Sequence, residues 1–260
     1  MTSCSSGVSY PKAHLVDGMR QVLKEEGLTA SVHVIDHTLA VHLEYPGSLS
    51  QTAGQIGIGP GFDDATRKVI GAVHRVLLSS DAEVRFYVVL VSDPTVPGGY
   101  LTLVRYMDDI KRANAQMLDT PEIFARTVLE LNFLGSTPVT IDAYVPRDIR
   151  LEEFLSWQLA RRIQMALTDE LQAKGIASVG RCGGRFEQGE FAFTLDVAPS
   201  STDQALDEAT LQEVFHTAST VIGKVLSSYH FQDFQAVRLF HTSTGRSFLL
   251  PKTRLLDVVR

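Results

Sequence analysis

The sequence predicts an α+β protein that contains two related α-β-β-α-β-β sandwich domains. Asp63-Asp64-Ala65-Thr66 is followed by an apolar helical pattern that ends at Ser79-Ser80. Asp207-Glu208-Ala209-Thr210 is followed by a similar pattern that ends at Ser227-Ser228. The predicted elements on either side of these two helices also follow one order. An internal duplication of an αβ unit accounts for both observations.

The first repeat is predicted to span residues 13–106. It opens with an amphipathic helix that ends near Gly27, because glycine commonly follows helix C-termini. The apolar face of this helix comprises Leu15, Val16, Met19, Val22 and Leu23. Alternation then predicts a hairpin over 31–35 and 38–44. Its core-facing residues are Val32, Val34, Leu39, Val41 and Leu43. The remaining elements are a glycine-rich loop over 54–61, a helix from Asp63, and strands over 84–91 and 100–106.

The second repeat is predicted to span residues 151–260 and follows the same order. A long helix runs from 151 to about 174 and ends at Gly175. The helix after Asp207 is one turn longer than its counterpart in the first repeat. The strands are expected over 177–181, 190–197, 235–241 and 246–250.

Residues 107–150 are predicted to form an ordered connector between the repeats. Thr120-Pro121-Glu122 has the pattern of a helix start with proline in the first turn. Residues 127–133 and 139–144 alternate like strands, and a bare linker would be richer in Gly, Ser and Pro. Residues 1–12 are predicted to be a flexible tether.

Composition limits the function classes. Hydrophobic residues make up 44% and charged residues 21% of the 260 residues, as in folded globular proteins. The net charge of −6 argues against nucleic-acid binding, which depends on clustered Lys and Arg. We find no run of apolar residues long enough to span a membrane.

The N-terminus resembles the end of a bacterial lipoprotein signal. Small residues, Thr2-Ser3, precede Cys4, and small polar residues follow it. The resemblance implies lipid attachment at Cys4 and a place in the bacterial cell envelope, facing the periplasm. The charged and apolar regions of a secretory signal are missing before Cys4. Either Met1 is a downstream start, or the similarity is accidental and this is a frayed terminus of a cytoplasmic protein.

The order of elements in each repeat is similar to that of the ring-building modules in bacterial secretion and sporulation machines. Those modules pack two helices on a small sheet and stack side by side into rings. One branch of them consists of lipoproteins with two modules. The resemblance is one of topology, and it implies an assembly role.

Three groups of residues are candidates for chemistry. The 54–61 loop before a helix could bind phosphate, but it lacks a Gly-Lys-Ser/Thr ending, and Asp63 and Asp64 would repel an anion. We therefore interpret it as a mobile loop with an N-capping aspartate. His33, His37 and His42 are close in sequence and could meet a metal with Asp36 and Glu44, but a solvent-facing strand surface explains them better.

Cys182 is the third candidate, because Arg181 and Arg185 could lower the pKa of its thiol. A half-buried thiol in a glycine-rich hairpin turn is the favoured interpretation. The acidic pairs Asp108-Asp109 and Glu152-Glu153 are interpreted as helix-start or surface charges. No Gly-x-Ser-x-Gly elbow is present.

The strands over 86–91 and 101–106 are rich in β-forming residues, and exposed sheet edges pair with other chains unless they are guarded. In the second repeat, Arg238 and His241 are expected to guard an edge. In the first repeat, Arg85 and Arg105 flank an unbroken apolar middle. We therefore expect the first repeat's sheet, or the connector packed on it, to carry a protein interface.

These observations favour a non-enzymatic structural or assembly component of a bacterial envelope protein complex, lipid-anchored at Cys4. Its partners would be other protein subunits, with further copies of the chain as one option. It would contact the membrane only through the lipid and would bind no nucleic acid, cofactor or metal. The alternative is a soluble ligand-binding or regulatory module with a site between the two repeats. A third hypothesis is an enzyme that uses the 54–61 loop or Cys182.

Overall fold

The computed structural model describes residues 10–52, 55–135, 140–200 and 206–258. The protein is mixed α+β with several sheets. The chain divides into two compact units, 1–149 and 150–260. The predicted lipid-attachment residue, Cys4, lies outside the described residues.

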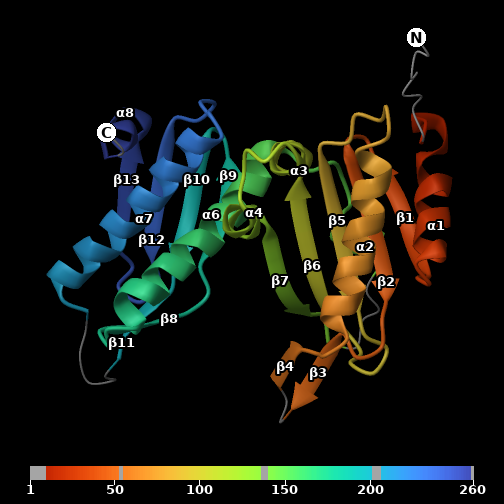
Figure 1. Ribbon diagram of the computed structural model, residues 1–260. Helices are drawn as coiled ribbons and strands as arrows, with labels where there is room; N and C mark the ends of the chain where they lie inside the picture. Colours follow the sequence, from red (N-terminus) through yellow and green to blue (C-terminus); the bar gives the residue numbers. More distant parts are fainter. Residues whose placement is uncertain (1–9, 53–54, 136–139, 201–205, 259–260) are drawn as a thin grey trace. The chain divides into compact units, whose positions relative to one another are not determined.

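The first unit is built on a five-stranded sheet in the order β1-β2-β5-β6-β7 (Figure 1). Its strands are β1 (Ala30–Ile35), β2 (Thr38–Glu44), β5 (Phe86–Ser92), β6 (Gly99–Tyr106) and β7 (Val128–Phe133). Strands β2 and β5 are parallel, and every other neighbouring pair is antiparallel. All seven residues of β5 are buried, as in a central strand covered on both faces.

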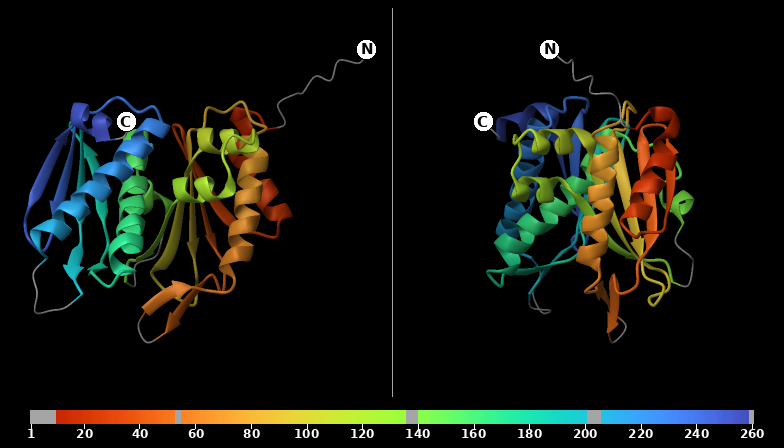
Figure 2. Two further views of the ribbon diagram at one scale, coloured as in Figure 1. Left: turned by 60° about the vertical axis from the view of Figure 1, so that its left-hand side comes forward. Right: turned by 45° about the vertical axis from the view of Figure 1, so that its right-hand side comes forward.

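Two helices, α1 (Leu15–Glu25) and α2 (Phe62–Leu77), lie on one face of this sheet (Figures 1 and 2). Helix α2 is the crossover that the parallel pair β2 and β5 requires. The helices and the inward-facing strand residues share one apolar core, which includes Met19, Val41, Val69, Val73 and Val89.

Shorter elements complete the first unit. They are a 3₁₀ turn (Lys12–His14), β3 (Leu49–Thr52), β4 (Gln55–Ile58), α3 (Met107–Asn114), α4 (Thr120–Arg126) and α5 (Ile141–Tyr144). Most of the predicted connector therefore belongs to the first unit, to which it contributes α3, α4, α5 and the edge strand β7.

The hairpin predicted over 31–35 and 38–44 is confirmed as β1 and β2, and all but one of its expected core residues are buried. The exception is Val34, which is partly exposed. Val34 pairs with Leu39 near the turn and borders a hollow at the start of α1, which Val16 and Val84 also line. Helix α1 does not fill this end of the sheet.

The second unit contains a four-stranded sheet in the order β13-β12-β10-β9. Its strands are β9 (Gly183–Glu187), β10 (Glu190–Leu195), β12 (Ala236–His241) and β13 (Ser247–Pro251). Strands β10 and β12 are parallel, and the two outer pairs are antiparallel. The helices are α6 (Leu151–Leu167), which continues as a π-helical turn (Thr168–Gln172), α7 (Glu208–Ser228) and α8 (Lys252–Val258).

The hairpin expected over 177–181 and 190–197 is wrong. Strand β8 (Ala177–Val179) pairs instead with β11 (Val197–Pro199) in a separate two-stranded sheet. The hairpin is formed by β9 and β10 around Gln188-Gly189, whose φ angles of 51° and 81° suit a tight turn.

Gly184 is a strand residue rather than the turn residue that we expected. A Cβ atom there would lie 2.3 Å from the Ser156 carbonyl oxygen, so the glycine allows α6 to approach β9 closely. In the sequence, this glycine suggested a turn. In the structure, it allows a helix to pack closely on a strand.

The strands with the longest apolar runs are not sheet edges, contrary to the expectation from sequence. Strands β5, β6 and β12 are interior, and the edges are β1 and β7 in one sheet and β9 and β13 in the other. Arg238 and His241 therefore do not guard an edge. His241 is fully buried, and its Nε2 donates to the Val197 carbonyl at 2.8 Å.

The two units share a pairing pattern. In each, a helix precedes an antiparallel hairpin, a second helix crosses over, and a third strand then lies parallel to the second and antiparallel to the fourth. Strand β7 has no counterpart in the four-stranded sheet of the second unit.

Candidate interaction site

The three hairpin histidines bind separate partners and do not converge. Their nearest partners are Asp142 Oδ1 for His33 (3.3 Å), Asp148 Oδ2 for His37 (3.2 Å) and Ser92 Oγ for His42 (2.8 Å). Among the described residues, no three His, Cys, Asp or Glu side chains are grouped as metal ligands. The contacts of His33 and His37 instead hold the segment after β7 against β1 and β2.

The described part of the glycine-rich segment, residues 55–61, contains a hairpin strand and is not an open loop. Residues 55–58 form β4, which pairs with β3. Beyond it, Gly61 donates its N–H to the Gly47 carbonyl at 2.7 Å, and a Cβ at Gly59 would lie 2.3 Å from the same oxygen. Close packing of two backbone segments explains these glycines.

Helix α2 begins after Gly61, so the expected N-cap at Asp63 is wrong. Asp63 and Asp64 lie in the first turn, where carboxylates complement the helix dipole. Asp64 pairs with Lys68 at 2.8 Å and accepts a hydrogen bond from the Tyr45 hydroxyl at 2.6 Å. These two bonds lower the pKa of Asp64. The helix start therefore carries negative charge and is unsuited to phosphate.

Cys182 is buried immediately before β9. Burial raises the pKa of its thiol to about 11, so the arginines close to it in sequence do not activate it. Its N–H donates to Gln164 Oε1 at 3.2 Å. A thiol with this pKa is almost wholly protonated at neutral pH and is a poor nucleophile.

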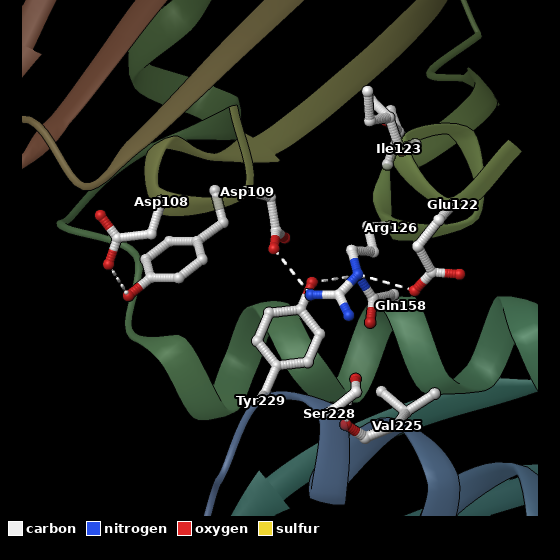
Figure 3. A network of polar contacts seen from close by, with 11 residues as sticks. Asp108, Asp109, Glu122, Ile123, Arg126, Gln158, Val225, Ser228 and Tyr229 are labelled. Atoms are coloured by element: carbon white, nitrogen blue, oxygen red, sulfur yellow. Dashed lines mark hydrogen bonds and ion pairs between the residues drawn. The ribbon is translucent and has the colours of Figure 1, made fainter. Parts of the chain in front are cut away.

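The acidic pair Asp108-Asp109 divides between two environments. Asp108 accepts a hydrogen bond from the Tyr106 hydroxyl at 2.8 Å on the surface. Asp109 is buried, and its carboxylate lies 2.7 Å from Arg126 Nη1. Figure 3 shows this ion pair. The interpretation as surface charge therefore fails for Asp109. In α6, Glu152 and Glu153 lie in the first helical turn, as predicted.

Arg126 joins α3 to α4 at the point where the chain enters β7. Its side chain is 4% exposed, its Nη1 binds Asp109, and its Nε lies 2.7 Å from Glu122 Oε1 (Figure 3). A buried guanidinium needs such partners, because its desolvation is costly. The Arg126–Asp109 ion pair ties together the two helices that connect β6 to β7. It therefore helps to hold β7 at the edge of the sheet.

Within the second unit, Gln158 of α6 donates to the hydroxyl of Tyr229, which follows α7, at 2.8 Å (Figure 3). Gln158 is fully buried. This polar bond therefore aligns α6 and α7 with each other.

A second buried polar cluster lies between α2 and the sheet of the first unit. The Tyr87 hydroxyl is 2.8 Å from His74 Nε2, and Arg105 Nη1 donates to the same hydroxyl at 3.4 Å. Burial, together with the Arg105 charge, lowers the pKa of His74 to about 4. His74 is therefore neutral, and its Nε2 accepts a hydrogen bond from the Tyr87 hydroxyl.

No protein-family model matches this chain, and no curated protein matches its sequence. Among the described residues, no helix is both long enough and apolar enough to cross a bilayer.

The surface with the clearest binding character lies at the end of β7. Leu131, Phe133 and Leu134, the β7 strip, are 37%, 58% and 44% exposed. The first two lie on the helix-covered side of the sheet, because Leu131 pairs with the core residue Leu101. Ile58 of the β3–β4 hairpin is also exposed.

The sequence contained the β7 strip but did not identify it. Residues 127–133 were recognisable as a strand by alternation, which also predicts that Leu131 and Phe133 face a core. Their exposure depends on where the helices end, and periodicity carries no information about that. The sequence does offer one signal: the predicted strand over 127–133 has no counterpart in the second repeat, but the two units have the same number of long helices to cover their sheets.

Replacing Arg126 with alanine should destabilise the protein by about 3–5 kcal/mol, because Asp109 would be left buried without its partner. Urea unfolding followed by circular dichroism measures this change. Arg67→Ala, which breaks an exposed pair with Asp64, should have no measurable effect. Equal stability of Arg126→Ala and the wild type would show that the pair is not structural.

Stability should fall as the pH is lowered from about 6.5 to about 4, because the unfolded chain protonates His74 while the folded chain does not. The depressed pKa predicts a loss of about 3 kcal/mol from this group, present in full above pH 6.5 and gone near pH 4. His74→Gln, which cannot be protonated, should flatten this part of the profile. Identical slopes in urea titrations of the two proteins would contradict the assignment.

Proposed function

We propose that this chain is a non-enzymatic structural or assembly component of a bacterial envelope protein complex. In this proposal it binds other protein subunits through the β7 strip. The observation that carries the proposal is the exposure of Leu131, Phe133 and Leu134 at the end of this edge strand. Contiguous exposed apolar residues on a folded protein mark interaction surfaces.

The exposure follows from the width of the sheet. Neighbouring helices pack 8–10 Å apart and neighbouring strands about 4.8 Å apart, so two helices cover about four strands. The second unit has four strands in its main sheet and the long helices α6 and α7. The first unit has five strands in its main sheet and the long helices α1 and α2. Its fifth strand, β7, is buried at its start, but Leu131 and Phe133 toward its end are left exposed.

We also infer that the two units arose by internal duplication. Their shared order of helices and strand pairings supports this, as does the sequence similarity around Asp63 and Asp207. On this interpretation β7 is a later addition to the first copy, and the interface would be a property that the second copy lacks.

The residues considered for catalysis have structural partners, which supports a non-enzymatic role. His33, His37 and His42 each bind a different side chain. The Cys182 thiol has a raised pKa, and Gly59 and Gly61 pack against the backbone of Gly47. The envelope location and the anchor rest on Thr2-Ser3-Cys4 in the sequence.

A Leu131→Ser/Phe133→Ser variant should lose the association that the proposal requires. We expect the wild type to self-associate in analytical ultracentrifugation or to cross-link to envelope proteins through a photoreactive residue at position 134. The matched control is Met165→Ser/Ile176→Ser, which removes two exposed apolar residues of the second unit and should leave association intact. A wild-type protein that stays monomeric at high concentration and cross-links to no envelope component would refute the interface.

Expression from the full native gene in a bacterial host should give a protein whose intact mass includes a lipid. Cys4→Ser should abolish that increase. An unmodified product from both genes would remove the anchor from the proposal, and a ligand-binding or regulatory module would become the better description.

A further inference from the structure

Among the described residues of the second unit, no helix packs on one face of its main sheet. Strand residues that point toward α6 and α7, such as Phe191, Phe193 and Leu239, are buried. Because side chains alternate along a strand, Ala192, Thr194, Arg238 and Phe240 point to the opposite face. A hollow of about 420 Å³ lies there, and Gly183, Arg185, Ala192, Thr194, Arg238 and Phe240 line it.

Strand register explains the hollow. Ala192 of β10 pairs with Arg185 of β9 on one side and with Arg238 of β12 on the other. With strands about 4.8 Å apart, the two arginine Cα atoms are about 10 Å apart across a methyl group. In the next row, Thr194 lies between Gly183 and Phe240. Short side chains thus form the floor, and two arginines and a phenylalanine form the walls.

Glu190 orients the Arg238 side chain, and this ion pair leaves some of the guanidinium N–H donors available. Its Nε lies 2.6 Å from Glu190 Oε1 and its Nη2 lies 3.0 Å from Glu190 Oε2. This bidentate pair uses two of the five guanidinium N–H donors. The other three, two on Nη1 and one on Nη2, form the fork at the end of the group, which matches the geometry of a second carboxylate.

The charges around the hollow are arranged by row. Arg185 Nε lies 3.5 Å from Glu187 Oε2, and Glu187 pairs with Glu190 across the strands, one row beyond the arginines. Phe240 lies one row on the other side of Arg238. A ligand above Ala192 and Thr194 would therefore meet the arginines and the aromatic ring before it meets either glutamate.

We propose that this hollow binds a planar aromatic carboxylate. The carboxylate would accept hydrogen bonds from the end of the Arg238 guanidinium, and its ring would pack against Phe240 above Ala192 and Gly183. Arg185 closes the opposite side with a second positive charge. The site lies in the second unit and is independent of the β7 strip, so it adds a ligand to the proposed assembly role and does not depend on it.

The test is isothermal titration of the full chain with 2-naphthoate. A charge-assisted hydrogen bond contributes about 1.5–3 kcal/mol, so Arg238→Gln should raise Kd roughly 10- to 100-fold. Phe240→Ser should also weaken binding. Ala192→Leu should abolish it by filling the hollow while all four charged groups remain. Arg75→Gln, which breaks a similar exposed arginine–glutamate pair in the first unit, should leave Kd unchanged.

Saturation-transfer NMR with 2-naphthalenemethanol, the uncharged analogue, should show weaker binding than 2-naphthoate. If Arg238→Gln fails to fold, Arg238→Lys and Ala192→Leu still test the site, because lysine keeps the charge and loses the fork. The proposal is overturned if the wild type does not bind 2-naphthoate. It is also overturned if Ala192→Leu binds as tightly as the wild type, or if the uncharged analogue binds equally well.

Discussion

Each unit depends on the packing of long helices against one face of a sheet. In the first unit α1 and α2 bury residues such as Met19, Val69 and Val73 completely, and each such side chain contributes about 1.5–3 kcal/mol. Sheet residues that lie beyond the ends or sides of these helices are not covered. The partly exposed Val34 at the start of α1 and the β7 strip at the far edge are both consequences of this limit. The limited width of the sheet that two helices can cover therefore explains both the buried core and the exposed β7 strip on which the proposed function depends.

Helix–sheet contact also explains the irregular features. Gly184 lets α6 approach β9 closely, and the buried Gln158 bonds to the Tyr229 hydroxyl. In the first unit, His74, Tyr87 and Arg105 form a polar chain between α2 and the sheet. Buried polar groups of this kind add little net stability but penalise other arrangements, because an unpaired group would be costly. The chain of His74, Tyr87 and Arg105 fixes how α2 lies on its sheet, and the bond between Gln158 and Tyr229 fixes how α6 lies beside α7.

The α+β class and the order of the main elements could be predicted from the sequence, because α1, α2 and the β1–β2 hairpin have clear periodicity. The mistakes have physical causes. Glycines at 183 and 184 suggested a turn, whereas they sit in a strand beneath a helix. Sheet edges could not be assigned, because strand order depends on contacts between residues far apart in sequence. The buried pair of Asp109 and Arg126 was hidden for the same reason: both residues look like ordinary surface charges until α3 and α4 are folded together.

The place of β7 at an edge has a further consequence for the dynamics of the first unit. Within this sheet β7 is hydrogen-bonded to β6 alone, so it can leave the sheet without breaking any other strand pairing. The four remaining strands with α1 and α2 would stay folded as one cooperative unit, while β7 and α4 form a separate, weaker one. Detachment would uncover the backbone edge of β6 and the apolar side chains of Leu101 and Leu103. The first unit thus carries a strand that could be exchanged for one from another chain. The buried Arg126–Asp109 ion pair opposes that exchange, because it ties α4 to α3.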